Sequence, residues 1–295
     1  MHKSVLLQEA IHSLAPHKGG VFVDATFGAG GHSSALAKAI GKTGELIAFD
    51  ADKSVFENPI VSTIESLTRF HPVVANFRTT GRELTKRKLV IDGALFDLGL
   101  SSTQLEQSGR GFTFQKDEPL RMTFAHSTKK NDVTAHAVVN DWSEETLVTI
   151  FKGFGEERFA RSIAKHIVMA RKVSPIATTA ELVEVIHQST PGWYQRGKTH
   201  FATKTFQAIR MAVNDELGAA KEGIVGALNH TKVGGHIAVI TFHSIEDRLV
   251  KQLFRELQTE HRIALVNKKP IVPGEDELKA NPRARSAKLR VIEKL

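Results

Sequence analysis

The chain has 295 residues, of which 41% are apolar, and its formal net charge is +8. This length suits one large domain, or one domain with an insertion, and the apolar content is enough for a buried core, so we expect a globular protein. The chain contains no cysteine. Disulfides, cysteine nucleophiles and thiolate zinc sites are therefore excluded.

No run of about 18 apolar residues occurs, and the first residues do not form a signal-peptide core, so we expect a cytoplasmic protein with no membrane partner. The fourteen histidines form no HExxH pattern, so no zinc site is expected and no metal ligands are assigned, while a hard cation held by scattered carboxylates is left open. The net positive charge favours an anionic partner.

Apolar periodicity predicts an alternation of strands and helices. Strands are expected over residues 21–27, 46–49, 73–77, 94–98, 236–242, 263–266 and 289–292. Helices are expected over residues 5–14, 33–40, 55–67, 143–151, 156–171, 179–189 and 205–228. This alternation predicts an α/β fold with a doubly wound, mostly parallel sheet and helices on both faces.

The first predicted strand runs into a glycine-rich turn, Gly28-Ala29-Gly30-Gly31, just before a helix. Glycines let the backbone turn tightly and let a ligand approach the positive end of that helix, which indicates a nucleoside cofactor near Gly28, Gly30 and Gly31. A dinucleotide fingerprint would need glycine or alanine where Ser33 stands. A phosphate-binding P-loop ending at Lys42-Thr43 would need glycine where Leu36 stands.

Asp50 ends the second predicted strand, twenty positions after Gly30. A carboxylate at this place usually accepts hydrogen bonds from ribose hydroxyls in doubly wound folds. The alternative is a solvated turn residue or a helix cap. Together with the glycine turn, Asp50 predicts an adenosine cofactor.

Asp97 lies at the end of the fourth predicted strand, where ligands of open α/β sheets bind. In a methyl transfer to an exocyclic amine, the amine needs an acceptor that aligns its lone pair and takes a proton. Asp97 is therefore the first candidate for a catalytic residue. The alternative is that it only caps a loop.

More than a hundred residues separate Asp97 from the next strand, far more than one crossover helix needs. Three of the predicted helices fall in this stretch. We therefore expect a core of residues 1–103 and 205–295, and an inserted helical subdomain of residues 104–204. The helix over 205–228 would return the chain to the core.

The turn after the fifth predicted strand reads Phe242-His243-Ser244-Ile245-Glu246-Asp247-Arg248. Ser244 as N-cap with Asp247 at the third helical position would explain part of this polarity. His243 and Arg248 are not needed for such a cap, so they are candidates to orient a base or to bind phosphate.

Cations and aromatics elsewhere predict an RNA partner. From Asn267 onward the chain has eight lysines and arginines against four acids, and an extended segment with Arg283 and Arg285 would space its charges as phosphate contacts require. Lys204 and Arg210 are further candidates for an RNA-facing surface, although a solvated face is the commoner outcome. Trp193 and Tyr194 would either stack on a base or pack within the insert.

Seven segments, taken together and in this order, resemble the bacterial RsmH (MraW) methyltransferase family over nearly the whole chain. They begin at Asp24-Ala25-Thr26-Phe27-Gly28, Asp97-Leu98-Gly99, Arg110-Gly111-Phe112, Gly155-Glu156-Glu157-Arg158, Thr205-Phe206-Gln207, Phe242-His243-Ser244 and Asn281-Pro282-Arg283. The resemblance implies a class I, Rossmann-like methyltransferase core that carries a helical insertion. It also implies S-adenosylmethionine as cofactor and N4 of one cytidine, in the decoding region of the 16S rRNA of the small ribosomal subunit, as target.

Carried over by motif, the cofactor contacts are Gly30, Gly31, His32, Asp50, Phe77, Asp97 and Gln104. Phe77, expected at the end of the third strand, would line the adenine pocket, and Arg110 would contact RNA. Asp97 and His243 are the expected catalytic residues. The oligomeric state is left open, a homodimer included.

One segment departs from the family pattern. Where the family commonly has Leu-Asp-Met-Arg-Met-Asp, this chain has Leu120-Arg121-Met122-Thr123-Phe124-Ala125, without the two acids and with the arginine two places earlier. If the segment positions the flipped cytidine or an RNA phosphate, we expect substrate affinity or geometry to differ here, and the effect on the choice of target is left open. The rival interpretations are a methyltransferase that acts on DNA or protein, and a non-catalytic rRNA-binding assembly factor.

Overall fold

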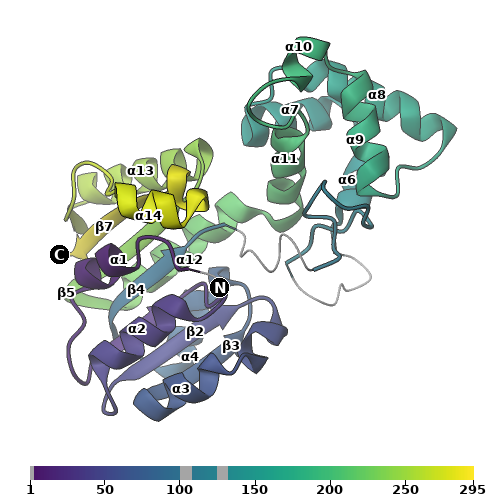
Figure 1. Ribbon diagram of the computed structural model, residues 1–295. Coiled ribbons are helices and arrows are strands. Elements are labelled where there is room, and N and C mark those ends of the chain that lie inside the picture. The colour runs from purple at the N-terminus through teal and green to yellow at the C-terminus, as the bar shows by residue number, and fades with distance from the viewer. Residues whose placement is uncertain (1–2, 100–107, 125–131) are drawn as a thin grey trace. The chain divides into compact units, whose positions relative to one another are not determined.

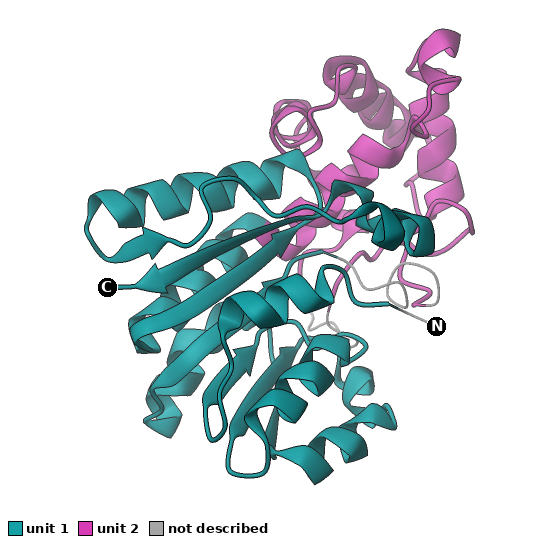
Figure 2. Ribbon diagram, turned by 60° about the vertical axis from the view of Figure 1, so that its left-hand side comes forward, with its two compact units in different colours: residues 1–99, 217–295 teal, residues 100–216 magenta. Residues whose placement is uncertain are grey.

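The computed structural model describes residues 3–99, 108–124 and 132–295 (Figure 1). It divides the chain into two compact units, which Figure 2 colours separately. The core unit comprises residues 1–99 and 217–295, and the helical unit comprises residues 100–216. The junctions therefore lie at 99/100 and 216/217, whereas sequence reasoning placed them at 103/104 and 204/205.

The core unit is built on a seven-stranded sheet with the strand order β3-β2-β1-β4-β5-β7-β6. Only β7 runs antiparallel to its neighbours. The strands are β1 (Val21–Asp24), β2 (Glu45–Asp50), β3 (Arg69–Val74), β4 (Ile91–Asp97), β5 (Thr231–Thr241), β6 (Ile263–Leu265) and β7 (Lys288–Lys294). The predicted α/β fold with a mostly parallel sheet is confirmed.

Helices cover both faces of this sheet. One face packs on α1 (Leu7–Leu14), α2 (Gly31–Ile40) and α3 (Ile60–Leu67), and the other on α4 (Thr80–Arg87), α12 (Glu216–His230) and α13 (Ser244–Thr259). Successive side chains of a strand point to opposite faces. Phe22 and Val23 of β1 accordingly belong to different apolar clusters, as do Leu95 and Phe96 of β4. This two-sided burial explains why the central strands read as continuous apolar runs.

Short elements complete the core unit, and two of them correct the predictions. They are η1 (Lys53–Glu57), η2 (Phe77–Thr79), α14 (Glu275–Ala280) and η3 (Pro282–Ser286). The single helix expected over 55–67 is η1 followed by α3, because Pro59 cannot continue a helix that began before it. The third strand ends at Val74, so Phe77 begins η2 and does not end a strand.

The helical unit is all-α in its described residues. Its helices are α6 (Ala135–Asp141), α7 (Glu144–Gly155), α8 (Ala160–Val173), α9 (Thr179–Gln188), α10 (Gly192–Gln195) and α11 (Thr203–Asn214). Their shared apolar core includes Phe151, Ile163, Leu182 and Ile209. The helix expected from Glu156 begins instead at Ala160, because Glu156 adopts a left-handed conformation with φ of 48°.

The helix expected over 205–228 is two helices, α11 and α12. Asp215 separates them with φ of 45°, a left-handed conformation that ends a helix. α11 packs closely on α7, since a Cβ added to Gly155 would lie 2.6 Å from the carbonyl oxygen of Lys204. This packing places α11 in the helical unit and moves the junction from residue 204 to 216. No helix in the described ranges is long and apolar enough to cross a membrane.

Candidate active site

Four acidic side chains lie at one edge of the core sheet. Asp24, Asp50 and Asp97 end the neighbouring strands β1, β2 and β4, and Glu246 lies in the first turn of α13, directly after β5. Because these strands are parallel, their carboxyl ends meet at the edge where ligands of open α/β sheets bind. Sequence reasoning named Asp50 and Asp97 and missed Asp24 and Glu246 as members of this group.

The glycine turn beside this edge requires glycine at Gly30. Gly30 has φ of 78°, and an added Cβ would lie 2.8 Å from Ile60 Cγ2 and 2.9 Å from Phe27 Cζ. Gly28 has φ of 51°, and among the described residues only the carbonyl oxygen of Thr26, at 3.9 Å, lies near its Cβ position. The space beside Gly28 is thus open, so a ligand can approach the backbone there.

Asp50 fixes this turn. Its Oδ2 accepts the backbone N–H of Gly28 at 2.9 Å, and its Oδ1 accepts that of Asp52 at the same distance. Burial, with smaller contributions from the charges of Asp52 and Asp24, raises the pKa of Asp50 to about 6, against the lowering effect of the two backbone donors. Each carboxylate oxygen can accept a second hydrogen bond, so Asp50 can hold the turn and a ribose hydroxyl together.

Asp24 lies directly beneath the turn and is buried. Ser33 Oγ donates to its Oδ2 at 2.6 Å, and the backbone N–H of Thr26 donates to its Oδ1 at 3.1 Å. Burial raises the pKa of Asp24 in spite of these donors. Ser33, the residue that breaks the dinucleotide fingerprint, therefore has a defined role as the partner of Asp24.

The backbone N–H of Asp97 is hydrogen-bonded, whereas its side chain has few interaction partners. Its N–H donates to Thr26 Oγ1 at 2.7 Å, and its side chain is 22% exposed. Within the described residues, its buried Oδ1 has no hydrogen-bond partner, and its Oδ2 lies 3.6 Å from His32 Nδ1. Burial, followed by the charges of Asp24 and Glu246, raises the pKa of Asp97 well above its ordinary value.

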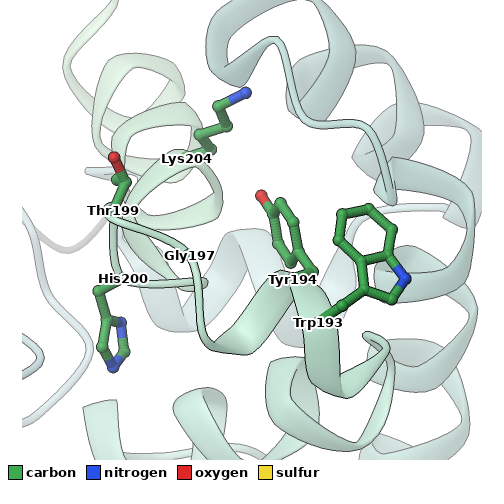
Figure 3. Close-up of a pocket in the computed structure, with 6 residues that line it drawn as sticks. All are labelled: Trp193, Tyr194, Gly197, Thr199, His200 and Lys204. Carbon is green, nitrogen blue, oxygen red and sulfur yellow. The ribbon is translucent and has the colours of Figure 1, made fainter.

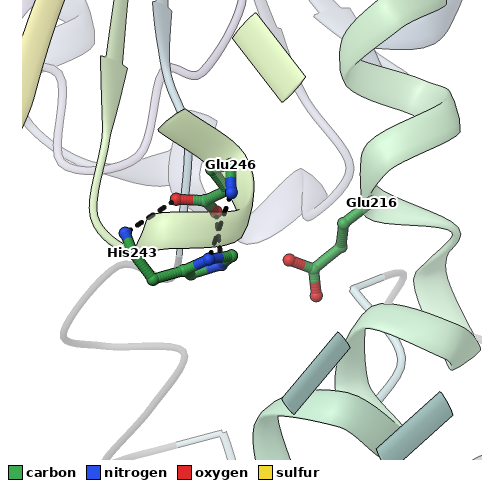
Figure 4. A group of neighbouring side chains, drawn as sticks. All are labelled: Glu216, His243 and Glu246. Carbon is green, nitrogen blue, oxygen red and sulfur yellow. Dashed lines mark hydrogen bonds and ion pairs between the residues drawn. The ribbon is translucent and has the colours of Figure 1, made fainter. Parts of the chain in front are cut away.

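His243 and Glu246 form the cap of α13 (Figure 4). His243 Nδ1 accepts the N–H of Glu246 at 3.3 Å, and His243 Nε2 lies 3.0 Å from Glu246 Oε1. Glu246 Oε2 accepts the N–H of Phe242 at 2.8 Å. The prediction that Ser244 caps this helix and that His243 is not needed for it is wrong. His243 Nδ1 is engaged in the cap, whereas Nε2, although 3.0 Å from Glu246 Oε1, has no hydrogen-bond partner among the described residues. The catalytic role of His243 stays a prediction.

The remaining predicted cofactor residues, His32, Phe77 and Gln104, do not share one environment. His32 is buried in the first turn of α2. The Phe77 ring packs edge-on against Phe96, with centroids 6.0 Å apart, and against the backbone at Gly223 of α12. Phe77 thus contributes to the apolar core on one face of the sheet. Gln104 lies outside the described residues.

The predicted RNA-facing cations fall into two groups. Arg248, Arg283 and Arg285 are exposed, but the last two lie in η3 and not in an extended segment. Arg110 is buried and donates from Nη1 to the carbonyl oxygen of Phe124 at 2.7 Å. Arg210 donates from Nε to Glu216 Oε1 at 2.7 Å and from Nη2 to Glu216 Oε2 at 2.9 Å. In this structure Arg110 and Arg210 therefore support the fold of the helical unit, and their RNA contacts stay predictions.

The basic C-terminal region is partly neutralised within the core unit. Lys288 Nζ and Arg290 Nε, both from β7, contact the two carboxylate oxygens of Asp247 at 2.9 and 2.7 Å. Burial alone would raise the pKa of Asp247, but these hydrogen bonds bring it below its ordinary value. The segment is a structural strand as well as a source of positive charge.

The helical unit has an aromatic cavity of about 310 Å³ (Figure 3), which is lined by Trp193, Tyr194, Gly197, Thr199, His200 and Lys204. The Trp193 side chain is exposed, and the Arg158 guanidinium lies 5.2 Å from the centroid of its ring. Tyr194 Oη donates to Glu157 at 2.7 Å, and Lys204 Nζ donates to the carbonyl oxygen of Glu156 at 3.0 Å. Burial lowers the pKa of His200, so its ring is neutral at physiological pH.

The segment that departs from the family pattern is tied to α11. Asn214 Nδ2 donates to the carbonyl oxygen of Met122 at 2.7 Å, and the N–H of Phe124 donates to Asn214 Oδ1 at 3.0 Å. Met122 is buried and has φ of 53°. The described part of the segment is thus hydrogen-bonded to α11 and has a structural role in the helical unit. Ala125 lies outside the described residues.

The acid group predicts an unusual pH dependence of stability. The pKa of Asp50 rises from an ordinary value of 3.8 to about 6 in the fold. Its contribution to stability is therefore fully present below 3.8 and is lost as the pH rises through 6, a change of about 3 kcal/mol. Asp24 acts in the same direction, because its pKa is raised as well.

We therefore expect the free energy of unfolding of the protein without cofactor to fall as the pH rises from about 4 to about 7. Asp92 and Asp247, whose pKa values are lowered, change stability in the opposite direction, but only in more acidic solution. Urea unfolding at successive pH values measures the effect. A stability that rises or stays constant over this range would show that the acids are not buried against one another.

These residues fit a positively charged nucleoside. The glycine turn leaves backbone open at Gly28, and Asp50 retains acceptor capacity for a ribose. The gathered carboxyl groups raise one another's pKa, and a bound sulfonium would favour their ionised forms. The fold and the site define an S-adenosylmethionine-dependent methyltransferase of the Rossmann-like class. The chain belongs to the MraW methylase family, which matches residues 1–295.

Curated relatives agree with this assignment over their full lengths. The chain is 42% identical to "Ribosomal RNA small subunit methyltransferase H" of Paenibacillus sp. (strain JDR-2), covering 100% of this chain and 99% of that protein. It is 41% identical to the protein of the same name from Brevibacillus brevis, covering 100% and 98%. Among solved structures, an rRNA methylase from Streptococcus thermophilus shares 12% identity with a TM-score of 0.46, covering 100% of this chain and 99% of that one.

Proposed function

We propose that the protein transfers a methyl group from S-adenosylmethionine to N4 of a cytidine in the decoding region of 16S rRNA, within the small ribosomal subunit in the cytoplasm. The observation that carries the proposal is Asp97, which presents a buried Oδ1 without a hydrogen-bond partner among the described residues, at the sheet edge beside the glycine turn. The names of the two curated relatives support rRNA of the small subunit as the substrate.

The cofactor supplies an activated methyl group on a positively charged sulfur. Asp97 Oδ1 accepts a hydrogen bond from the cytidine amine, which aligns the amine lone pair for displacement and takes a proton as the new bond forms. Asp50 and the Gly28–Gly31 backbone hold the nucleoside part of the cofactor. The cytidine must leave its stack to reach Asp97, as bases do in other enzymes that modify them.

The helical unit supplies a site for a neighbouring nucleotide of the unstacked strand. Trp193 offers an exposed ring face, and Arg158 and Lys204 place positive charge beside it for a phosphate. Exposed Arg248, Arg283 and Arg285 of the core unit add further phosphate contacts.

Trp193→Ala should weaken binding of single-stranded RNA about tenfold, because the stacking of one base on an aromatic ring contributes roughly 1–3 kcal/mol. Fluorescence anisotropy with an oligonucleotide of the target sequence measures the affinity. Met169→Ala is the matched control, since both side chains are 54% exposed and both belong to the helical unit. Equal RNA affinity of the Trp193→Ala and Met169→Ala variants would show that Trp193 is not part of the RNA-binding surface.

The test of the proposed function is a methylation assay with labelled S-adenosylmethionine on 30S subunits, naked 16S rRNA, DNA and total protein, followed by mass spectrometry of the nucleosides. N4-methylcytidine from the 30S sample is the expected product. Label in DNA or protein would favour the first rival. Absence of cofactor binding in isothermal titration would favour the second rival, a non-catalytic assembly factor. A homodimer stays a prediction, which analytical ultracentrifugation tests.

A further inference from the structure

The buried ring of His32 lies beside Asp97, and its two contacts indicate which ring nitrogens carry protons. Its Nε2 lies 3.1 Å from the carbonyl oxygen of Val5, and its Nδ1 lies 3.6 Å from Asp97 Oδ2. A carbonyl oxygen can only accept a hydrogen bond, so Nε2 carries a proton. In a neutral ring, Nδ1 would then direct a lone pair at a carboxylate oxygen.

One additional proton on the His32–Asp97 pair removes the unfavourable contact between the Nδ1 lone pair and the carboxylate oxygen. If the proton is on Nδ1, the ring is an imidazolium that faces the carboxylate of Asp97. Within the described residues, His32 is the only side chain able to carry a positive charge within 4 Å of Asp97. The ring is also buried, which strengthens its interaction with a neighbouring charge.

The other charged groups around Asp97 are acids. Asp24 faces it from β1 and Glu246 from α13, and Asp50 of β2 interacts in turn with Asp24. Glu246 is itself paired with His243, and Glu277 of α14 binds the N–H of Leu6 near the start of α1. Burial and these acids favour the protonated form of Asp97, and a protonated carboxyl group is a poor acceptor for the proton of an amine.

We propose that His32 is a positioning residue for methyl transfer, which holds a proton at Nδ1 against Asp97 Oδ2 and thereby keeps Asp97 ionised, with Oδ1 directed to the substrate amine. The inference rests on the proposed function. In the reaction, the bond from the amine nitrogen to the methyl carbon forms, the carbon–sulfur bond breaks, and its electron pair stays on sulfur. The amine proton moves to Asp97 Oδ1 and leaves to water at the exposed edge of that side chain.

Two substitutions separate the two contacts of His32. The amide nitrogen of His32→Gln can reach the carbonyl of Val5 but leaves Asp97 without a cation. The amide nitrogen of His32→Asn takes the place of Nδ1 and offers Asp97 a neutral donor. In single-turnover assays on 30S subunits, His32→Gln should be about tenfold slower than the native enzyme near neutral pH, because a carboxyl group whose pKa lies one unit above the pH is only about one-tenth ionised.

The pH profile distinguishes this role from a structural one. The rate of His32→Gln should approach that of the native enzyme as the pH rises to about 9, because Asp97 then ionises without help, and His32→Asn should lie between the two. A variant that is slower by the same factor at every pH would overturn the proposal. Isothermal titration of each protein with cofactor separates a loss of cofactor affinity, which would lower the rate by the same factor at every pH, from the expected pH-dependent loss of rate.

A readout independent of activity is the 15N NMR spectrum of the histidine rings without cofactor, with His32 identified by its absence in His32→Gln. At neutral pH the ring should be an imidazolium in the native protein and a neutral Nε2–H tautomer in Asp97→Asn. A neutral ring in the native protein, or a ring unchanged by Asp97→Asn, would overturn the proposal. If the native protein methylates nothing, the proposed function fails, while this spectrum still decides whether the pair shares its proton.

Discussion

The Asp97→Asn enzyme is expected to transfer methyl groups about a thousandfold more slowly than the native enzyme, since a positioned acceptor of a proton contributes roughly 10²–10⁴-fold. The amide keeps the size of the side chain and can still accept one hydrogen bond. It cannot take the proton that the amine loses. The affinity for S-adenosylmethionine should fall far less than the rate, because alignment of the amine is not part of cofactor binding.

Single-turnover rates on 30S subunits and isothermal titration measure the two quantities. Asp141→Asn, which alters an exposed acid at the end of α6, is the control and should match the native enzyme in both. Equal loss of rate and of cofactor affinity in Asp97→Asn would mean that Asp97 chiefly holds the cofactor. An undiminished rate would exclude Asp97 as the acceptor.

The second large effect is expected for Gly30→Ala, which should weaken cofactor binding at least tenfold and lower the free energy of unfolding by about 1–3 kcal/mol. The φ of 78° disfavours any side chain, and the added Cβ would lie 2.8 Å from Ile60 Cγ2 and 2.9 Å from Phe27 Cζ. The turn must move to relieve these contacts, and the hydrogen bond from Gly28 to Asp50 moves with it.

Isothermal titration and urea unfolding test this expectation. The control is Gly153→Ala in α7, where a Cβ has nothing within 4 Å and alanine should stabilise the helix by about 0.4–1 kcal/mol. Native cofactor affinity in Gly30→Ala would show that the turn does not shape the binding site.

The fold could be predicted from the sequence because most strands are buried on both faces. Continuous apolar runs mark β1, β2, β4 and β5. The errors arose where single residues decide the conformation. Pro59 divides a helix and Asp215 adopts a left-handed φ between two others. The edge strand β3 is largely exposed and has no apolar run to locate its end.

The candidate site could be predicted only in part, for a physical reason. The glycine turn, Asp50 and Asp97 follow from local pattern, because their places at strand ends are visible along the chain. The contact of His32 with Asp97 joins α2 to β4, and the carbonyl of Val5 that fixes the ring comes from a third segment. Spacing in the sequence does not encode such contacts.

The cap of α13 illustrates the same limit. Ser, Thr, Asp and Asn are the usual N-caps, which favoured Ser244, whereas the ring of His243 takes this role and Glu246 completes the box. Arg110 was expected on an RNA-facing surface because of its charge and its motif. The Arg110 side chain is instead buried and donates a hydrogen bond to the carbonyl oxygen of Phe124. The sequence alone does not show this contact.

The most direct test of the account is a crystal structure of the protein with S-adenosylhomocysteine. We predict that the ligand lies against the Gly28–Gly31 backbone with its ribose hydroxyls on Asp50 and its sulfur facing Asp97. A ligand bound elsewhere, or with its sulfur directed away from Asp97, would contradict the site and the reaction derived from it.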